Sequence, residues 1–193
     1  MSELFSIQLQ NRQQQGRDGV WLDLPTTTEQ VQAALRQIGI SSDNPQGLFI
    51  SGYFAEEEKR FAIPYNMVLA SNVDELNFLA SRLETLSTGE RAELNAALQA
   101  PQSELFSIGR ITDFPENVDY YVHLPDVRGP AQLGDYYLNR SGMVDMPEEW
   151  KGGIDTAQFG RYVAQQEQGV FTEYGYLVKS GDAWQKVHEG QPV

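Results

Sequence analysis

Three short apolar runs in the first third of the chain have the pattern of β-strands. Residues 3–9 alternate apolar and polar positions, residues 20–24 form a second run that Pro25 stops, and residues 47–54 form a third. Alternation, aromatic and β-branched residues and a terminating proline are typical of strands. We therefore expect three strands packed side by side, the first two joined by the polar loop 11–19.

A helix is predicted between the second and third strands. Thr26 and Glu29 have the spacing of a capping box, and Gly39 follows the last periodic position. The apolar residues between them recur at helical spacing: Val31, Ala34, Leu35 and Ile38. Strands and helix together predict an N-terminal α+β domain over residues 1–65.

The middle of the chain has helical periodicity and predicts a helical domain, residues 66–110. Asn72 can cap a helix whose apolar stripe is Val73, Leu76, Leu79, Ala80 and Leu83. A second capping box runs from Ser87 to Glu90, and Pro101 ends the helix that follows it. A pair of helices this short does not bury its apolar faces alone, so we expect it to pack against its neighbours.

The last segment, residues 111–193, returns to a mixed pattern and predicts a C-terminal α+β domain. The expected helices are 130–139, with Pro130 in its first turn, and 155–168, capped by Asp155 and stopped by Gly169. The expected strands are 119–124, 170–178 and 183–187, the last two forming a hairpin across 180–182. The predicted fold class is α+β, an elongated chain of small α+β and helical domains.

A six-residue repeat links two of these domains. The letters of Ser2–Ile7 recur as Ser103–Ile108, with no similarity beyond them. A duplicated unit and chance both remain open.

Amino-acid composition limits the classes of function that are compatible with this chain. The 14 Lys and Arg residues against 27 Asp and Glu give a net charge of −13, so the surface repels nucleic acid and favours basic partners. The chain has no cysteine, which excludes disulfides and thiolate zinc sites. The N-terminus lacks a signal-peptide pattern and no run of 18 apolar residues occurs, so we expect a cytoplasmic protein with no membrane association.

No constellation of residues predicts catalysis or a cofactor. The two histidines, His123 and His188, lie in candidate strands without a metal-ligand spacing, which favours structural roles. Carboxylate pairs such as Glu148 and Glu149 are numerous enough to supply a glycosidase, but nothing in their spacing selects one pair. No calcium-binding loop is present. We therefore expect no enzyme activity, no metal and no cofactor.

Negative charge is spread along the chain. Residues 113–149 carry a net −6 and residues 62–107 a net −4. Acids at helical spacing lie roughly 6 Å apart, close to the phosphate repeat along one DNA strand. Such fixed charges fit a protein that occupies a DNA-binding groove, and they also fit an ordinary acidic soluble domain.

Several motifs resemble the ArdA antirestriction family. The N-terminal part is similar in residues 19–25 and 38–40. The stronger similarity lies in Leu133–Tyr137, Ile154–Asp155 with Phe159–Arg161, Gly169–Thr172 and Tyr174–Tyr176. The resemblance implies three small domains, a homodimer formed through the C-terminal region, and a non-catalytic mimic of bent duplex DNA. Its implied partner is a type I restriction-modification enzyme whose DNA groove the mimic occupies, and its implied origin is a mobile genetic element or phage.

In the mimic hypothesis two groups of residues have roles. The acids that stand in for phosphates are Asp74, Glu75, Glu84, Glu90, Glu93, Asp113, Glu116, Asp119, Asp126, Asp135, Asp145, Glu148 and Glu149. The candidates for dimer or core contacts are Gly134, Tyr136, Tyr137, Phe159, Gly160 and Tyr162, the two glycines indicating close approach of another backbone.

Two alternatives remain. An acidic adaptor would bind a basic protein surface unrelated to DNA enzymes, and duplex DNA would not displace it. A carbohydrate-acting hydrolase would have a concave pocket containing one carboxyl group of raised pKa.

Overall fold

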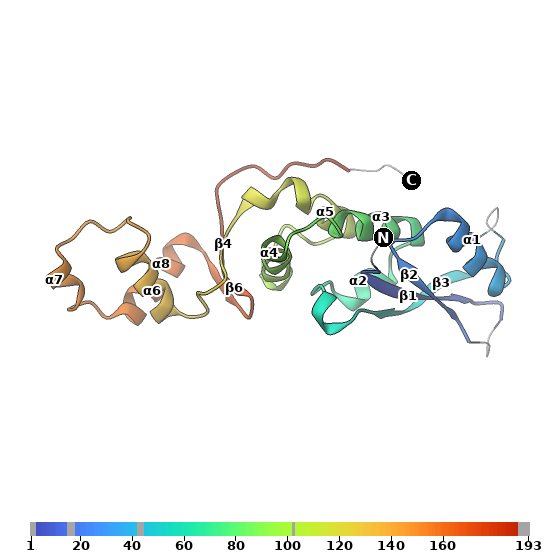
Figure 1. The fold of residues 1–193 in the computed structure, drawn as a ribbon, viewed down its shortest axis with the longest axis horizontal. Helices are drawn as coiled ribbons and strands as arrows, with labels where there is room; N and C mark the ends of the chain where they lie inside the picture. Colours follow the sequence, from blue (N-terminus) through green and yellow to red (C-terminus); the bar gives the residue numbers. More distant parts are fainter. Residues whose placement is uncertain (1–2, 15–17, 42–44, 102, 189–193) are drawn as a thin grey trace. The chain divides into compact units, whose positions relative to one another are not determined.

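The computed structural model describes residues 3–14, 18–41, 45–101 and 103–188, which have the α+β fold predicted from the sequence (Figure 1). Two compact units are present. The described parts of 1–87, 105–116 and 186–193 form unit 1, and those of 88–104 and 117–185 form unit 2. The division into domains 1–65, 66–110 and 111–193 remains a prediction, since compactness does not show which segments fold independently.

Unit 1 is built on a three-stranded antiparallel sheet with the order β2-β1-β3. The strands are β1 (Phe5–Asn11), β2 (Val20–Leu24) and β3 (Leu48–Phe54). Alternate residues of β1 are buried, as the apolar pattern predicts, and Ile7 and Leu9 are completely inaccessible. The first strand extends two residues beyond the predicted end.

Helix α1 (Thr28–Gln37) starts one residue later than the sequence predicts. Its N-cap is Thr27, whose hydroxyl accepts from the Gln30 N–H, and the Gln30 side chain accepts from the Thr27 N–H. The predicted cap, Thr26, instead has its backbone N–H and C=O bonded to the Asn77 amide, at 2.7 and 3.0 Å. A long-range hydrogen-bonded pair therefore moves the capping box by one residue.

The remaining helices of unit 1 bury apolar residues against their neighbours in the unit. Asn72 caps the predicted helix, α3 (Val73–Leu83), by accepting from the Glu75 N–H at 2.8 Å, and all five residues of its predicted stripe are buried. The other helical elements are α2 (Tyr65–Leu69), α5 (Ile108–Thr112), and the 3-10 turns η1 (Glu57–Lys59) and η2 (Phe114–Glu116).

The repeated hexapeptide has no common structure. The described part of its first copy runs into β1, where Phe5 and Ile7 are buried in the sheet. In the second copy Phe106 is exposed, and Ser107 caps α5 by accepting from the Arg110 N–H at 3.3 Å. The neighbours of each copy set its conformation, so the fold gives no support for a duplicated unit.

Unit 2 has a smaller antiparallel sheet with the order β4-β6-β5. Its strands are β4 (Tyr121–Leu124), β5 (Val170–Thr172) and β6 (Gly175–Lys179). The prediction of one strand at 170–178 paired with 183–187 is wrong. The hairpin lies within 170–179, because the Thr172 hydroxyl accepts from the Tyr174 N–H and donates to the Gly175 carbonyl, which closes a tight turn.

The helices of unit 2 are α4 (Thr88–Gln99), α6 (Pro130–Asn139), α7 (Glu148–Lys151) and α8 (Thr156–Glu167), with the 3-10 turn η3 (Val118–Tyr120). The short helix α7 lies between the two helices predicted at 130–139 and 155–168, where no helix was expected. Asp155 caps α8 as predicted, accepting from the Gln158 N–H at 3.0 Å.

Helix α8 ends differently from the prediction. The left-handed residue is Gln168, with φ of 57°, and not Gly169. Gly169 is required for another reason. A Cβ there would lie 1.9 Å from the Tyr176 hydroxyl oxygen, so only glycine leaves room for that buried ring.

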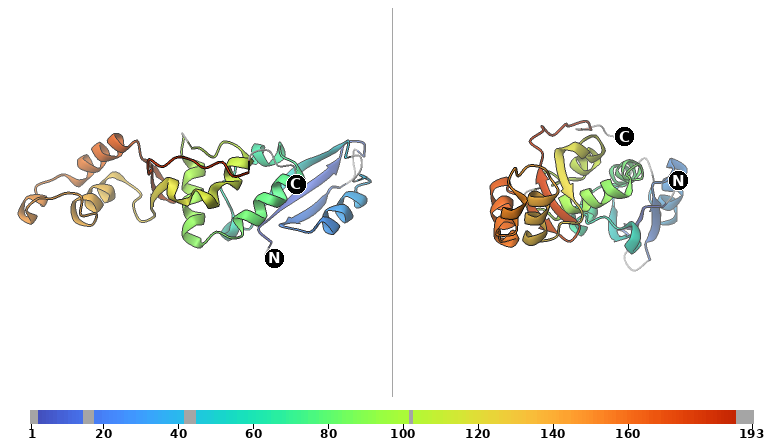
Figure 2. Two further views of the ribbon diagram at one scale, coloured as in Figure 1. Left: turned by 90° about the horizontal axis from the view of Figure 1, so that it is seen from above. Right: turned by 60° about the vertical axis from the view of Figure 1, so that its left-hand side comes forward.

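Helices α6 and α8 lie side by side with their backbones in contact (Figure 2). A Cβ on Gly134 would lie 1.9 Å from the Thr156 carbonyl oxygen, and one on Gly160 would lie 1.8 Å from the Pro130 carbonyl oxygen. The close approach predicted for these glycines is thus a contact within the chain.

Candidate functional site

Both histidines have structural environments. The Nε2 of His123, in β4, lies 2.9 Å from the Tyr174 carbonyl oxygen. His188 lies outside any strand, contrary to the prediction, and its ring packs edge-on against Phe78 with centroids 5.1 Å apart. Among the described residues no group of three or more His, Cys, Asp or Glu is placed to hold a metal ion.

Unit 2 has the larger share of exposed acids from the candidate surface. Asp119 lies in η3, Asp126 follows β4, Asp145 precedes α7, and Glu148 and Glu149 form the first turn of α7. All five residues are exposed. We call these five residues the acidic set of unit 2.

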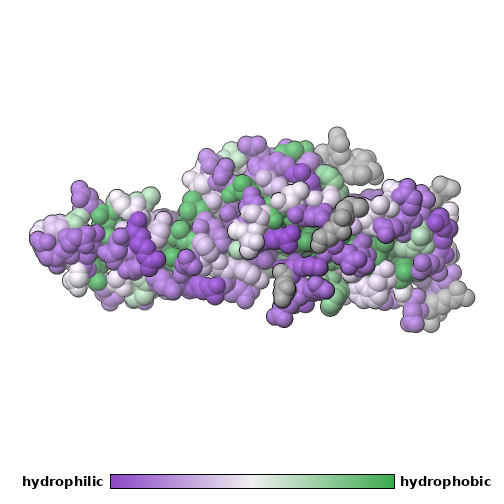
Figure 3. Space-filling view, viewed as in Figure 1, coloured by the Kyte–Doolittle hydropathy of each residue, from purple (hydrophilic) through white to green (hydrophobic). Residues whose placement is uncertain are grey.

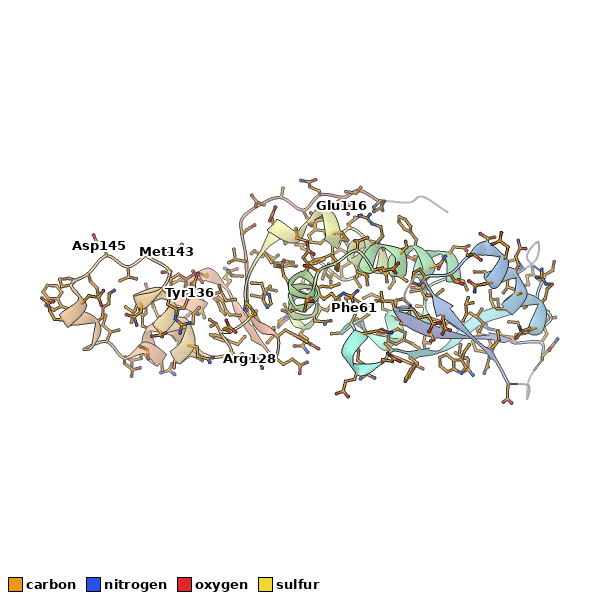
Figure 4. All side chains as sticks on the ribbon, viewed as in Figure 1. Phe61, Glu116, Arg128, Tyr136, Met143 and Asp145 are labelled. Atoms are coloured by element: carbon orange, nitrogen blue, oxygen red, sulfur yellow. The ribbon has the colours of Figure 1, made fainter. Side chains whose placement is uncertain are left out.

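Local structure explains where these carboxylates are. Acidic residues in the first turn of α7 interact favourably with the positive end of the helix dipole. Asp145 and Met143 lie on the connection between α6 and α7 (Figure 4). The surface around α7 is largely hydrophilic on the face shown in Figure 3.

Basic residues neutralise part of this charge. Lys151 Nζ lies 2.6 Å from Glu148 Oε1, and Arg140 Nη2 lies 2.7 Å from Asp135 Oδ2. Hydrogen bonds from Asn139 and Arg140 hold the pKa of Asp135 below its ordinary value, so this half-exposed carboxyl group stays ionised. Over all its residues unit 2 has 13 acidic and six basic side chains, a net charge of −7.

The candidate acids of unit 1 have more varied environments. Asp74 is exposed, whereas Glu75 and Glu84 are half-buried. Glu116, on η2, pairs with Arg82 of α3. Asp113 is only 2% exposed, and its Oδ1 accepts from the His188 N–H at 2.9 Å, so its prediction as a surface anion is wrong.

Glu93 differs from the other candidates because its carboxyl group is largely buried in α4. Burial, followed by the neighbouring Glu90 and Asp119 carboxylates, raises its pKa to about 8. Its Oε1 is buried and accepts no hydrogen bond. At neutral pH Glu93 is mostly protonated, so it contributes little to a surface of anions. Its half-buried neighbour Glu90 lies on the same helix.

The aromatic candidates are mostly part of the unit 2 core. Tyr136 and Tyr137 on α6 are half-buried and stack edge-to-face, with ring centroids 5.4 Å apart. Phe159 on α8 is half-buried, whereas Tyr162 is 60% exposed. Of these residues only Tyr162 presents most of its ring to solvent.

Sequence reasoning missed one residue that organises this core. Glu167 accepts hydrogen bonds from both the Tyr137 and the Tyr176 hydroxyls, the second at 2.9 Å. Burial, followed by the bond to Glu167, raises the pKa of each phenol. The three residues are far apart in sequence, and an isolated Glu near a helix end gives no signal of this arrangement.

Comparison with known proteins decides the family. A family model described as "Antirestriction protein (ArdA)" matches residues 15–178. The chain belongs to the ArdA antirestriction protein family. No curated protein matches it significantly.

The ArdA match covers every candidate residue from Asp74 to Tyr162 and ends within β6. Membership gives the chain an antirestriction function, with a protein of a restriction system as partner. ArdA proteins are inhibitors and not a known family of enzymes, so the raised pKa of Glu93 is better explained by burial than by a hydrolase site. In the described residues no helix has the length and apolar character to cross a membrane.

Proposed function

We propose that this ArdA-family protein inhibits type I restriction-modification enzymes by occupying their DNA-binding groove as a mimic of bent duplex DNA. The observation that carries this proposal is the acidic set of unit 2, five exposed carboxylates on η3, on the turn after β4, on α7 and on the connection just before α7. Carboxylates on folded elements have fixed positions, as phosphates do in a duplex, whereas an acidic tail fluctuates.

The binding energy in this mechanism is a sum over many weak contacts. Each exposed carboxylate faces water and salt, so a single ion pair contributes about 0.2–1 kcal/mol. The chain acts by binding alone, without catalysis or cofactor, inside the cell where restriction enzymes act. As a homodimer it carries twice −13, or −26, close to the charge of about 13 base pairs of duplex DNA.

A cleavage assay tests this proposal. A purified type I enzyme is incubated with its DNA substrate and increasing amounts of the protein, at several salt concentrations. We expect cleavage to stop at saturating protein, excess duplex DNA to displace the protein from the enzyme, and affinity to fall as salt rises. Parallel measurement of DNA methylation shows whether modification is inhibited as well.

The outcomes separate the mimic from an acidic adaptor. Binding that duplex DNA does not displace would indicate a basic protein surface other than the DNA groove. Unchanged cleavage at saturating protein would contradict the proposal for that enzyme class.

A further inference from the structure

Unit 1 contains a groove between strand β2 and helix α1, which lie next to each other in Figure 2. Its volume is about 460 Å³, within the range of ligand-binding clefts. One wall of the groove is formed by consecutive residues of β2, from Val20 to Asp23. The other wall is formed by residues of α1. Because consecutive strand residues point to opposite faces of a sheet, a groove that they line together follows the strand's edge.

That edge of β2 has unpaired backbone groups. Among the described strands β2 pairs with β1 alone. The Leu24 carbonyl oxygen faces β1, where it accepts from the Leu4 N–H at 2.8 Å. Backbone direction alternates along a strand, so the N–H and C=O groups of Trp21 and Asp23 point away from β1 toward the groove.

The helix wall leaves space opposite this edge. Gln30, Ala33, Ala34 and Gln37 follow the spacing i, i+3, i+4, i+7, so they form one stripe of α1. The two central residues are alanines, which keep the middle of the groove open. The glutamines at either end supply amide groups.

The charge of the lining selects its ligand. Two acidic residues, Glu3 and Asp23, line the groove, and none of the described lining residues is Lys, Arg or His. Asp23 is exposed and accepts a hydrogen bond at 2.6 Å from the hydroxyl of Ser6, its partner on β1, which holds the carboxylate on the solvent-exposed face of the sheet. A cationic side chain beside Asp23 or Glu3 would therefore meet an opposite charge.

We propose that this groove binds an extended, basic peptide segment of a partner protein, which adds to β2 as a fourth strand. The peptide backbone pairs with the free groups of Trp21 and Asp23, and its lysine or arginine side chains lie beside Asp23 and Glu3. Small peptide side chains face Ala33. Strand addition of this kind combines backbone hydrogen bonds for affinity with side-chain contacts for specificity. This site uses the backbone of unit 1 and is independent of the anionic surface proposed for DNA mimicry.

Amide hydrogen exchange of the full chain tests the proposal. The probe is a capped heptapeptide of alternating lysine and valine, and the controls are the glutamate–valine peptide and the lysine peptide N-methylated at alternate amides. We expect saturable binding of the lysine peptide with slower exchange of the Trp21 and Asp23 amides. The N-methylated peptide keeps the charges but loses one edge of backbone donors, so its binding should be at least about tenfold weaker.

Matched variants locate the site. Ala33→Trp fills the groove and should weaken binding about tenfold or more, whereas Gln32→Trp, at an exposed position of α1 outside the lining, should leave it unchanged. Asp23→Asn keeps the acceptor for Ser6 and should weaken binding about threefold.

Four results would overturn the proposal: no saturable binding at millimolar peptide, equal binding of the N-methylated peptide, equal binding of the glutamate peptide, or equal effects of the two tryptophan variants. Since the backbone contacts tolerate many sequences, a failure of the lysine peptide counts against strand addition itself. This experiment measures peptide binding and not antirestriction activity. A negative result for the groove therefore leaves the proposed function untouched, and the reverse also holds.

Discussion

At the scale of single residues, burial decides which acids carry charge. Glu93, Glu148 and Glu149 have the same side chain, and the sequence places all three among the phosphate mimics. In the fold the last two are exposed, while Glu93 is half-buried, with its Oε1 inaccessible and two other carboxyl groups nearby. A list of acids therefore overstates the anionic surface, because solvation differs between positions that the sequence does not distinguish.

Replacement of Glu93 tests this difference. The pKa of Glu93 rises from an ordinary 4.5 to about 8 on folding, so between these values the folded chain holds a proton that the unfolded chain has lost. Its contribution to stability is complete below pH 4.5 and is lost as the pH rises toward 8. Glu93→Gln lacks this loss, so we expect its Tm to exceed that of the parent protein by a margin that grows from pH 4 to pH 8.

The measurement is thermal unfolding of both proteins across this pH range. Glu149→Gln is the control, since Glu149 is exposed and lies in a first helical turn. Its Tm difference from the parent should stay small at every pH. A constant Tm difference for Glu93→Gln would show that its carboxyl group titrates normally.

At the scale of elements, local patterns predicted most of the helices and failed where distant groups intervene. Helix 130–139 agrees with the prediction residue for residue, because proline and helical periodicity are local signals. The cap of α1 is displaced by Asn77, which is 51 residues away from Thr26. The C-terminal hairpin was predicted wrongly because both candidate runs have strand composition and only the Thr172 turn chooses between them.

The crossing of α6 and α8 gives a prediction at this scale. In Gly160→Ala the new methyl group would overlap the Pro130 carbonyl oxygen, so the helices must separate. We expect a loss of about 3 kcal/mol in the free energy of unfolding, at the upper end of overpacking effects. Urea unfolding followed by circular dichroism measures it.

Gly152→Ala is the matched control in the same unit. A Cβ at Gly152 would meet no atom within 4 Å, and its φ of −64° suits any residue. This variant should be about as stable as the parent. Equal stability of Gly160→Ala would show that the helices do not pack through this glycine.

At the scale of the whole molecule, the sequence was enough to predict the family. It was not enough to predict which acidic residues carry negative charge at the surface. Short motifs such as Leu133–Tyr137 and Phe159–Arg161 pointed to the ArdA family, and each of these two motifs contributes a glycine to the contact between α6 and α8. The net charge of −13 is equally a property of the sequence. Which acids face solvent depends on tertiary packing. Asp113 is an example, because packing buries it although its side chain is hydrophilic.

Neutralising the acidic set of unit 2 tests the mimic as a whole. The combined variant is Asp119→Asn, Asp126→Asn, Asp145→Asn, Glu148→Gln and Glu149→Gln. At about 0.5 kcal/mol for each contact, we expect the half-inhibitory concentration to rise on the order of 50-fold, whereas single replacements should change it less than about threefold. The measurement is inhibition of type I cleavage at fixed salt.

A second combined variant controls for net charge. It neutralises five other exposed acids: Asp18, Glu29, Glu56, Glu57 and Asp182. If position matters, this variant keeps more of its inhibition than the first. Equal losses would mean that inhibition follows total charge and not an arrangement of anions.

The close contact between α6 and α8 also has a consequence for the segment that joins them, because this segment is not needed to hold the two helices together. Because two glycines seat one helix directly on the other's backbone, residues 140–155 need only span the gap, and all but a few of their side chains remain outside the core. This segment contains Asp145, Glu148 and Glu149. Substitutions in this segment can therefore change the surface charge without altering the packing of α6 against α8.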